Sequence, residues 1–312
     1  MVYTVTLNPA VDRILFIDEF FRARTNRIKK TVETLGGKGT HVSINLKLLG
    51  VQSTALGITL GENGRKITRM MESWGVEVRF LHYEIPGMES RVNCELVEEK
   101  GHYCSMLTER GPILPVSITD ALTEQMRRLI KPGDMLVLTG DASNVEDTAI
   151  YTKLTLCAKE LGAKTFLDAS GEYLVKGLRS QPFLIKPNLE ELCYLTGKEI
   201  KTEEEIIAAL RGMDGLGIAI VAMTWSGSGA VVKSGADIYR VYPVKVNVVN
   251  EVGCGDAFLS AVVAGLIRGE SMEDLLKGAT AVAGAAAESE ITAGFDAARA
   301  KELRKQAKVK KL

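Results

Sequence analysis

Neither charge sign is in excess in this chain of 312 residues, where 39 lysines and arginines balance 39 aspartates and glutamates. No global field therefore favours binding to nucleic acid or to an anionic membrane surface. No apolar run approaches the roughly 20 residues that a membrane span needs. Met1–Val5 lacks the charged segment and the cleavage site of a signal peptide. We expect a cytoplasmic protein with neither a nucleic-acid partner nor a membrane partner.

Patterns for disulfides and for bound metal are missing as well. The five cysteines are odd in number and dispersed, without a Cys-x-x-Cys pair, which argues against a disulfide framework and a structural zinc. Cys94 and Cys104 could approach each other across a hairpin, but buried or half-buried free thiols are the expectation. His41, His82 and His102 have no metal-ligand spacing, so each is expected to pack in the interior or to face solvent.

Strand and helix patterns alternate along most of the chain, with no repeat and no low-complexity linker. Tyr3, Val5 and Leu7 alternate with polar residues, as in a strand, and Pro9 ends that pattern. Strands that alternate with helices favour an α/β fold with a mostly parallel sheet covered on both faces. We therefore expect one domain over residues 1–312. Further strands are expected at 54–60, 135–138, 165–168, 183–186, 218–223, 231–233 and 238–246. Helices are expected after Gly39 and at 65–74, 118–130, 147–161, 189–196, 202–211 and 257–267.

A few segments depart from this alternation. Residues 14–35 are strand-like and mixed, and residues 91–98 and 102–107 predict a hairpin inserted into the alternating chain. Residues 61–64 are expected to form a loop, and the basic end, 304–311, a solvated helix end. Binding sites in parallel sheets lie beyond the carboxyl ends of the strands. The residues expected at such ends are Asn8, Gly140, Asp168, Lys186 and Thr224.

The stretch with the most chemical content runs from Asn250 to Phe258. Gly253 and Gly255 lack a Cβ, so the backbone can turn tightly there and approach another molecule. Asp256 falls in the first turn of a segment so apolar that it predicts a buried helix. A helix start favours an anion such as phosphate, and a carboxylate there could take a proton from an attacking hydroxyl. The alternative is that Asp256 only complements the helix dipole, worth under about 1 kcal/mol.

The segment from Lys186 to Glu191 follows a short apolar strand. In one interpretation Asn188 caps a helix and Glu191, at its third position, closes a capping box. In the other, Asn188 and Glu191 lie near a hydrated Mg²⁺, which prefers few carboxylates plus waters, and Lys186 lies close to phosphates. Taken alone, the motif mostly indicates a helix cap.

Three further stretches bear on small-molecule binding. The Gly-Gly-Lys-Gly run at 36–39 lacks the spacing of a P-loop, and it suits a phosphate or polyol about as well as a simple tight turn. Residues 224–230 form either a loop beside a nucleotide or a plain hairpin loop, because Val232 replaces the third glycine of a dinucleotide fingerprint. Asp12 is either an acceptor for sugar hydroxyls or a turn residue.

Taken together, these motifs resemble the PfkB (ribokinase-like) family of carbohydrate kinases, in order and over nearly the whole chain. The start of the chain and the Gly-Gly-Lys-Gly run look like the phosphosugar branch, that of 1-phosphofructokinase and tagatose-6-phosphate kinase. The motifs that carry the resemblance are Leu7–Asp12, Gly36–Gly39, Asp168–Gly171, Lys186–Glu191 and Val252–Asp256.

The resemblance implies a three-layer α/β/α fold with a mostly parallel central sheet and a small β-sheet lid. The strands of the lid are then expected at about 13–35 and 90–107. Lids in this branch often pair into homodimers, and the apolar Phe16, Phe20 and Phe21 suit either such a contact or an intradomain core.

The resemblance also implies ATP and Mg²⁺ as cofactors and a phosphosugar as acceptor. Asp256 looks like the catalytic base, and the amides of Gly253, Cys254 and Gly255 look like the anion hole for the transferred phosphoryl group. Asn188 and Glu191 match a motif linked to Mg²⁺ through water. The positions that match the sugar-phosphate site are Asp12, Gly37, Lys38 and Arg91. The positions assigned to ATP are Lys186, Asn188, Thr224, Ser226, Gly227 and Gly229.

The sugar side of the chain departs from the family pattern. Thr40 and His41 stand where the family usually has Ile and Asn. Residues 140–144 replace a G-S-L-P segment, and residues 108–112 shorten a T-E-x-N-x-x-G-P region. Glu251 and Cys254 replace Thr and Ala beside the glycines. The base and metal motifs are retained, which predicts a kinase, whereas the other changes indicate an altered sugar or sugar phosphate.

The leading hypothesis is therefore ATP- and Mg²⁺-dependent phosphorylation of a ketohexose phosphate, with fructose 1-phosphate converted into fructose 1,6-bisphosphate and Asp256 as base. Tagatose 6-phosphate and tagatose 1-phosphate are alternative substrates. From another class, the chain would be a non-catalytic sugar-phosphate sensor on a kinase scaffold. A dehydrogenase is disfavoured by the missing dinucleotide fingerprint.

Overall fold

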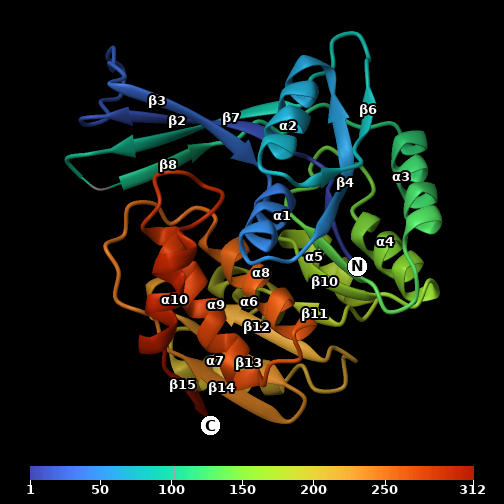
Figure 1. The fold of residues 1–312 in the computed structure, drawn as a ribbon, viewed down its shortest axis with the longest axis vertical. Helices are drawn as coiled ribbons and strands as arrows, with labels where there is room; N and C mark the ends of the chain where they lie inside the picture. Colours follow the sequence, from blue (N-terminus) through green and yellow to red (C-terminus); the bar gives the residue numbers. More distant parts are fainter. Residues whose placement is uncertain (102) are drawn as a thin grey trace.

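The computed structural model describes residues 1–101 and 103–312. Within this part of the chain the strands form an eleven-stranded central sheet and a separate four-stranded sheet (Figure 1). His102, expected to begin a strand and to pack or face solvent, lies outside the described residues. No helix among the described residues is long and apolar enough to cross a membrane.

The central sheet is mostly parallel, as the alternation predicts. From one edge its order is β15-β14-β13-β12-β11-β10-β9-β1-β4-β5, and β6 pairs with β4. All pairs from β12 to β5 are parallel, whereas the last three strands pair antiparallel. The strands are β1 (Val2–Thr6), β4 (Ser53–Leu60), β5 (Glu77–Val78), β6 (Leu81–Tyr83), β9 (Met135–Thr139), β10 (Lys164–Asp168), β11 (Leu184–Ile185), β12 (Ile220–Thr224), β13 (Ala230–Ser234), β14 (Asp237–Val241) and β15 (Val309–Lys311).

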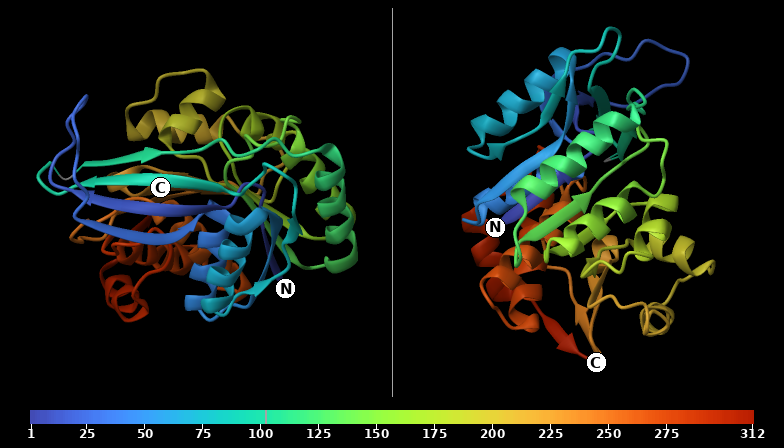
Figure 2. Two further views of the ribbon diagram at one scale, coloured as in Figure 1. Left: turned by 90° about the horizontal axis from the view of Figure 1, so that it is seen from above. Right: turned by 90° about the vertical axis from the view of Figure 1, so that its right-hand side faces the viewer.

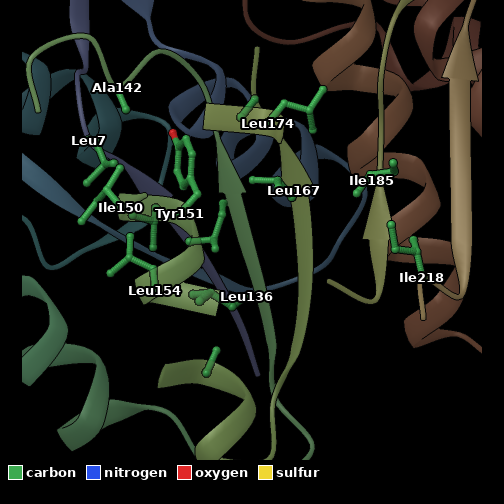
Figure 3. Close-up of a cluster of buried hydrophobic side chains, with 14 of the residues drawn as sticks. Leu7, Leu136, Ala142, Ile150, Tyr151, Leu154, Leu167, Leu174, Ile185 and Ile218 are labelled. Carbon is green, nitrogen blue, oxygen red and sulfur yellow. The ribbon is translucent and has the colours of Figure 1, made fainter. Parts of the chain in front are cut away.

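Helices cover both faces of this sheet because its strands are apolar on both sides. In β9, Leu136 and Leu138 enter one buried cluster and Val137, between them, enters the other. Figure 3 shows part of the first cluster, including Leu136 and Leu154. It packs α3 (Val116–Leu129), α4 (Ile150–Glu160), α5 (Gly171–Leu178), α6 (Leu189–Thr196) and α7 (Glu203–Arg211) on the sheet. The opposite cluster packs α1 (Lys38–Leu48), α8 (Cys254–Ile267), α9 (Met272–Ala287) and α10 (Ala297–Gln306).

The four-stranded sheet, called the small sheet below, has the order β3-β2-β7-β8. It consists of β2 (Ala10–Ile17), β3 (Lys30–Gly36), β7 (Arg91–Glu98) and β8 (Tyr103–Leu107). Both segments expected to supply lid strands contribute strands to it, although residues 18–29 of the first form a connection between β2 and β3. Figure 2 shows this sheet extending over the C-terminal part of the chain, drawn in orange and red. A third apolar cluster joins its base to α1 and to α2 (Gly61–Ser73), through Val11, Leu35, Ile44 and Ile67.

Several local expectations are wrong where distant groups act on the backbone. Helix α2 begins at Gly61 and not after a loop, because the Glu89 carboxylate accepts the amides of Glu62 and Asn63 and caps the helix start. The basic end is not a solvated helix end throughout, since Val309–Lys311 forms β15 along the edge of β14. The strand expected to reach residue 246 stops at Val241.

The cysteines are free, as expected. Cys94 and Cys104 do not meet across the hairpin, because Cys94 lies opposite Leu107 and Cys104 lies opposite Val97. Cys94 is half-buried, whereas Cys104 is exposed and donates to the Glu95 carboxylate.

Candidate active site

A cavity of about 1380 Å³ lies where the small sheet meets the carboxyl ends of the central strands and the start of α8. Its wall includes every residue assigned above to catalysis, acceptor binding or ATP, and Glu191 alone among the assigned residues is not in it. The assigned residues in the wall are Asp12, Gly37, Lys38, Arg91, Lys186, Asn188, Thr224, Ser226, Gly227, Gly229, Gly253, Cys254, Gly255 and Asp256.

The topology brings these residues together. Lys186 follows β11 and Thr224 ends β12, and these neighbouring parallel strands end at the same edge of the sheet. Asn188 forms a bridge with Thr224 there. The small sheet supplies Asp12 and Arg91 from adjacent strands, β2 and β7. The expected position at or beyond the strand ends is thus confirmed for Lys186 and Thr224.

The start of α8 forms a backbone cradle. Gly253 precedes the helix with φ of 86°, and a Cβ on it would lie 1.9 Å from the carbonyl oxygen of Thr292. Only glycine fits this left-handed turn. The amides of Gly253 and Gly255 have no hydrogen-bond partner among the described residues. Such a turn into a helix start is a binding site for an anion.

Asp256, buried in the first turn of α8, is hydrogen-bonded to a histidine that sequence reasoning assigned only to packing or solvent. Its Oδ2 lies 2.8 Å from Nδ1 of His41 in α1, and both side chains are buried. Nε2 of the same ring lies 2.8 Å from the carbonyl oxygen of Leu35. His41 is therefore part of the site. Its only sequence signal was that it stands where similar kinases usually have Asn.

Two lysines meet on one fully buried carboxylate. Nζ of Lys38 lies 2.9 Å from Oδ1 of Asp168, and Nζ of Lys186 lies 3.1 Å from Oδ2. Burial opposes ionisation, but the two ammonium groups outweigh it and hold the pKa of Asp168 below its ordinary value. A Cβ on Gly255 would lie 3.3 Å from Nζ of Lys186, so this ammonium lies against the start of α8. The amides and the two cations together favour a phosphate group.

The Asn188–Glu191 motif forms a complete capping box. Oδ1 of Asn188 accepts the Glu191 amide at 2.8 Å, and Oε2 of Glu191 accepts the Asn188 amide at 2.9 Å. Burial raises the pKa of Glu191. No group of three or more metal-ligating side chains occurs among the described residues. The Glu191 carboxylate and the Asn188 amide oxygen are donors of the kind that fit a hydrated Mg²⁺, which prefers few carboxylates plus waters.

The small-sheet side of the cavity carries a polar network. Nδ2 of Asn93 donates to Oδ1 of Asp12 at 2.7 Å, which orients the carboxylate. Arg91 is buried, and its guanidinium donates to the carbonyl oxygens of Asn8 and Glu109 and to the carboxylate of Asp141. Asn93 and Asp141 were not assigned from the sequence, although Asp141 lies in a segment that departs from the family pattern.

The opposite side combines a glycine loop with apolar residues. This loop, at residues 225–229, joins the antiparallel β12 and β13 and is therefore a hairpin loop. It also borders the cavity. Gly229 has φ of 92°, and a Cβ there would lie 2.3 Å from the carbonyl oxygen of Val241. Apolar residues in the wall of the same cavity suit a flat ring such as a nucleotide base. They are Val244, Val246, Val248, Ala283 and Ala287.

Comparison with known proteins places this site in a family. The model of the pfkB family carbohydrate kinases matches residues 5–296. The chain is 32% identical over 284 residues to a tagatose-6-phosphate kinase of Staphylococcus epidermidis, covering 90% of both chains. It is 32% identical over 277 residues to a 1-phosphofructokinase of Bacillus subtilis, covering 89% of both chains. A crystal structure of phosphofructokinase-2 from Escherichia coli in complex with potassium superposes with a TM-score of 0.90 at 22% identity, covering 98% of both chains. The chain belongs to the pfkB family of carbohydrate kinases.

Proposed function

We propose that this kinase transfers the γ-phosphoryl group of ATP to a ketohexose phosphate, with fructose 1-phosphate as the favoured acceptor and O6 as the attacking atom. The observation that carries the proposal is the position of Asp256. Its carboxylate lies in the first turn of α8, beside unpaired amides, in the same cavity as Asp12 and Arg91. The two 32% identical relatives are named for phosphosugar substrates, which supports an acceptor of that class.

In this proposal each residue of the site has a separate role. Asp256 takes the proton of the acceptor hydroxyl as that oxygen attacks phosphorus. The amides of Gly253 and Gly255 hold the charge that develops on the transferred group. The amide of Cys254, between them, donates to the Glu251 carbonyl oxygen at 3.4 Å in this structure and joins them when that long hydrogen bond opens. Lys186, fixed by Asp168, stands beside them. Positioning and electrostatics then supply most of the catalysis, as is usual for phosphoryl transfer.

ATP lies along the loop that contains Thr224, Ser226, Gly227 and Gly229, with its phosphates toward Lys186 and Asn188. Mg²⁺, when bound, neutralises charge on those phosphates. Asn188 and Glu191 would hold it through water. The acceptor contacts are Asp12, Gly37, Lys38 and Arg91.

Tagatose 6-phosphate and tagatose 1-phosphate are the alternative acceptors. The relative named a tagatose-6-phosphate kinase is as similar to this chain as the one named a 1-phosphofructokinase. The Arg91–Asp141 ion pair, at 3.0 Å, bears on all three acceptors alike, because each of them carries a phosphate for which Asp141 competes.

The direct test is ADP release with ATP and Mg²⁺ across fructose 1-phosphate, fructose 6-phosphate, tagatose 1-phosphate, tagatose 6-phosphate and the unphosphorylated hexoses. One phosphosugar should show kcat/KM well above the others and name the substrate. ADP release with none of them, together with measurable ATP binding, would contradict the proposal and favour the sugar-phosphate sensor.

We further propose that the protein is a cytoplasmic homodimer that pairs through the small sheet. The support is that Phe20 and Phe21 in the β2–β3 connection and Tyr103 and Leu107 on the edge strand β8 are exposed. Edge strands and exposed apolar side chains favour pairing with a second copy. Sedimentation velocity should give twice the 33.9 kDa chain mass, and a monomer at micromolar concentration would contradict this.

A further inference from the structure

His41 is held at both ring nitrogens inside the site. Nδ1 faces the Asp256 carboxylate and Nε2 faces the Leu35 carbonyl, each at 2.8 Å, and the ring is buried. The Leu35 carbonyl also accepts from the hydroxyl of Thr292, which fixes its direction. The imidazole therefore bridges α8 and the end of β3.

Counting protons fixes the charge of this arrangement. A carbonyl oxygen only accepts, so Nε2 must carry a proton. A neutral ring would then present the bare lone pair of Nδ1 to a carboxylate, two acceptors 2.8 Å apart. One proton between Nδ1 and Oδ2 removes that repulsion. An imidazole is ordinarily more basic than a carboxylate, so the proton lies on Nδ1 and makes an imidazolium–carboxylate pair.

The surrounding charges also favour the imidazolium. The acidic groups facing the ring are Asp256 from α8, Asp12 from β2 and Glu95 from β7. Lys38, one turn earlier on α1, has its ammonium on Asp168. Burial alone would lower the pKa of His41, but the hydrogen bond to Asp256 and the nearby negative charge raise it above the ordinary 6.5.

We infer that His41, as an imidazolium, is the positioning residue of Asp256: it binds Oδ2 and leaves Oδ1 as the atom that meets the acceptor hydroxyl. This inference rests on the proposed function. In the transfer step the acceptor O–H bond breaks and its proton goes to Oδ1, while the acceptor oxygen forms a bond to the γ-phosphorus of ATP. The bond from that phosphorus to the ADP oxygen breaks, so ADP leaves with the electron pair.

A loss of activity at alkaline pH follows. When His41 loses its Nδ1 proton, the lone pair faces Oδ2 and the carboxylate turns away from its working position. The kcat of the wild-type enzyme should therefore fall as pH rises through the pKa of His41, which lies above 6.5. His41→Asn, which restores the amide usual in similar kinases and cannot titrate, should remain active and lose this alkaline fall. His41→Ala should lower kcat about 10- to 100-fold at pH values where the wild-type ring is an imidazolium, because the base is no longer oriented, and the deficit should shrink at alkaline pH.

His82→Asn is the matched control, since His82 also contacts a carboxylate, that of Glu84, but lies outside the cavity. It should keep the wild-type pH profile. An alkaline fall that persists unchanged in His41→Asn would overturn the inference, as would full activity of His41→Ala.

A spectroscopic test needs no substrate and so separates this inference from the proposed function. The chain has three histidines, so ¹⁵N-labelled imidazole signals can be assigned with His41→Asn and His82→Asn. In the wild-type protein the His41 ring should carry protons on both nitrogens at pH 7, and Asp256→Asn should remove the Nδ1 proton. A neutral His41 ring at pH 7 in the wild-type protein would overturn the inference, whether or not any sugar is phosphorylated.

Discussion

The carboxylate of Asp141 lies 3.0 Å from the guanidinium of Arg91, the only arginine of the small sheet that faces the cavity among the described residues. Oδ2 of Asp141 also accepts from Asn8 and from the Ser143 hydroxyl, so the carboxylate is fixed by several donors. Under the proposed function, in which Arg91 contacts the acceptor, the negative charge of Asp141 competes with the acceptor phosphate for this guanidinium.

Removing that carboxylate should improve the binding of phosphosugars. Asp141→Ser frees Arg91 for a phosphate, and KM for the preferred phosphosugar should fall about 3- to 10-fold, the equivalent of roughly 1 kcal/mol from charged hydrogen bonds. kcat should change little, since neither Arg91 nor Asp141 is hydrogen-bonded to Asp256. Asp147→Ser, outside the cavity wall, is the control. A raised KM in Asp141→Ser would mean that Asp141 itself binds the acceptor.

The turn before α8 should tolerate only glycine. Gly253→Ala forces an L residue to φ of 86° and places its Cβ on the Thr292 carbonyl oxygen. Unfolding free energy should fall by at least about 2 kcal/mol, and kcat should fall because the amides move. Gly269→Ala is the matched control, with φ of 65° but nothing within 4 Å of the added carbon, and should cost about 1 kcal/mol. Equal losses in the two variants would contradict the steric argument. Both are measured by urea unfolding.

Glu95 should give the fold a specific pH dependence. Its side chain is fully buried on β7, Oε2 has no hydrogen-bond partner in the described part of the chain, and burial raises its pKa above the ordinary 4.5. At pH values between the ordinary pKa and the raised pKa of the folded chain, the Glu95 carboxyl is ionised in the unfolded chain and protonated in the folded chain. The free energy of unfolding therefore falls as pH rises through this range. The slope is at most about 1.4 kcal/mol per pH unit for one proton.

Glu95→Gln should remove this contribution. The unfolding free energy of the variant minus that of the wild type should increase as pH rises above 4.5, and this difference should then become constant. Urea unfolding between pH 4 and pH 8 measures the difference. The exposed Glu204→Gln in α7 serves as control and should show no such gain. A constant difference for Glu95→Gln across this range would show that the carboxyl does not titrate differently in the folded chain.

Local signals account for what could be predicted of the fold. Helix α6 has the predicted bounds because Asn188 and Glu191 cap its start and Gly197, with φ of 65°, ends it, all within ten residues. The start of α2 could not be predicted in this way, since its cap, Glu89, lies 26 residues beyond Asn63 in the chain. The same holds for β15, which exists only because β14 offers an edge.

The same distinction between local and distant signals applies to the residues of the site. Lys186 and Thr224 could be placed because parallel strands end at one edge, and Gly253 because its motif is local. The His41–Asp256 hydrogen bond could not be predicted, since 215 residues separate its partners and one histidine in a helix normally indicates packing. Contacts made by the tertiary fold therefore supply the part of the chemistry that motifs do not contain.

Asp256→Asn tests the central claim most directly. With the preferred phosphosugar, kcat for ADP release should fall about 10²- to 10⁴-fold, because an amide cannot accept the hydroxyl proton. ATP binding, measured by calorimetry, should stay close to that of the wild type. Asp120→Asn, on the surface of α3, should leave both unchanged. Turnover by Asp256→Asn at a rate near that of the wild type would contradict the assignment of the base and the mechanism built on it.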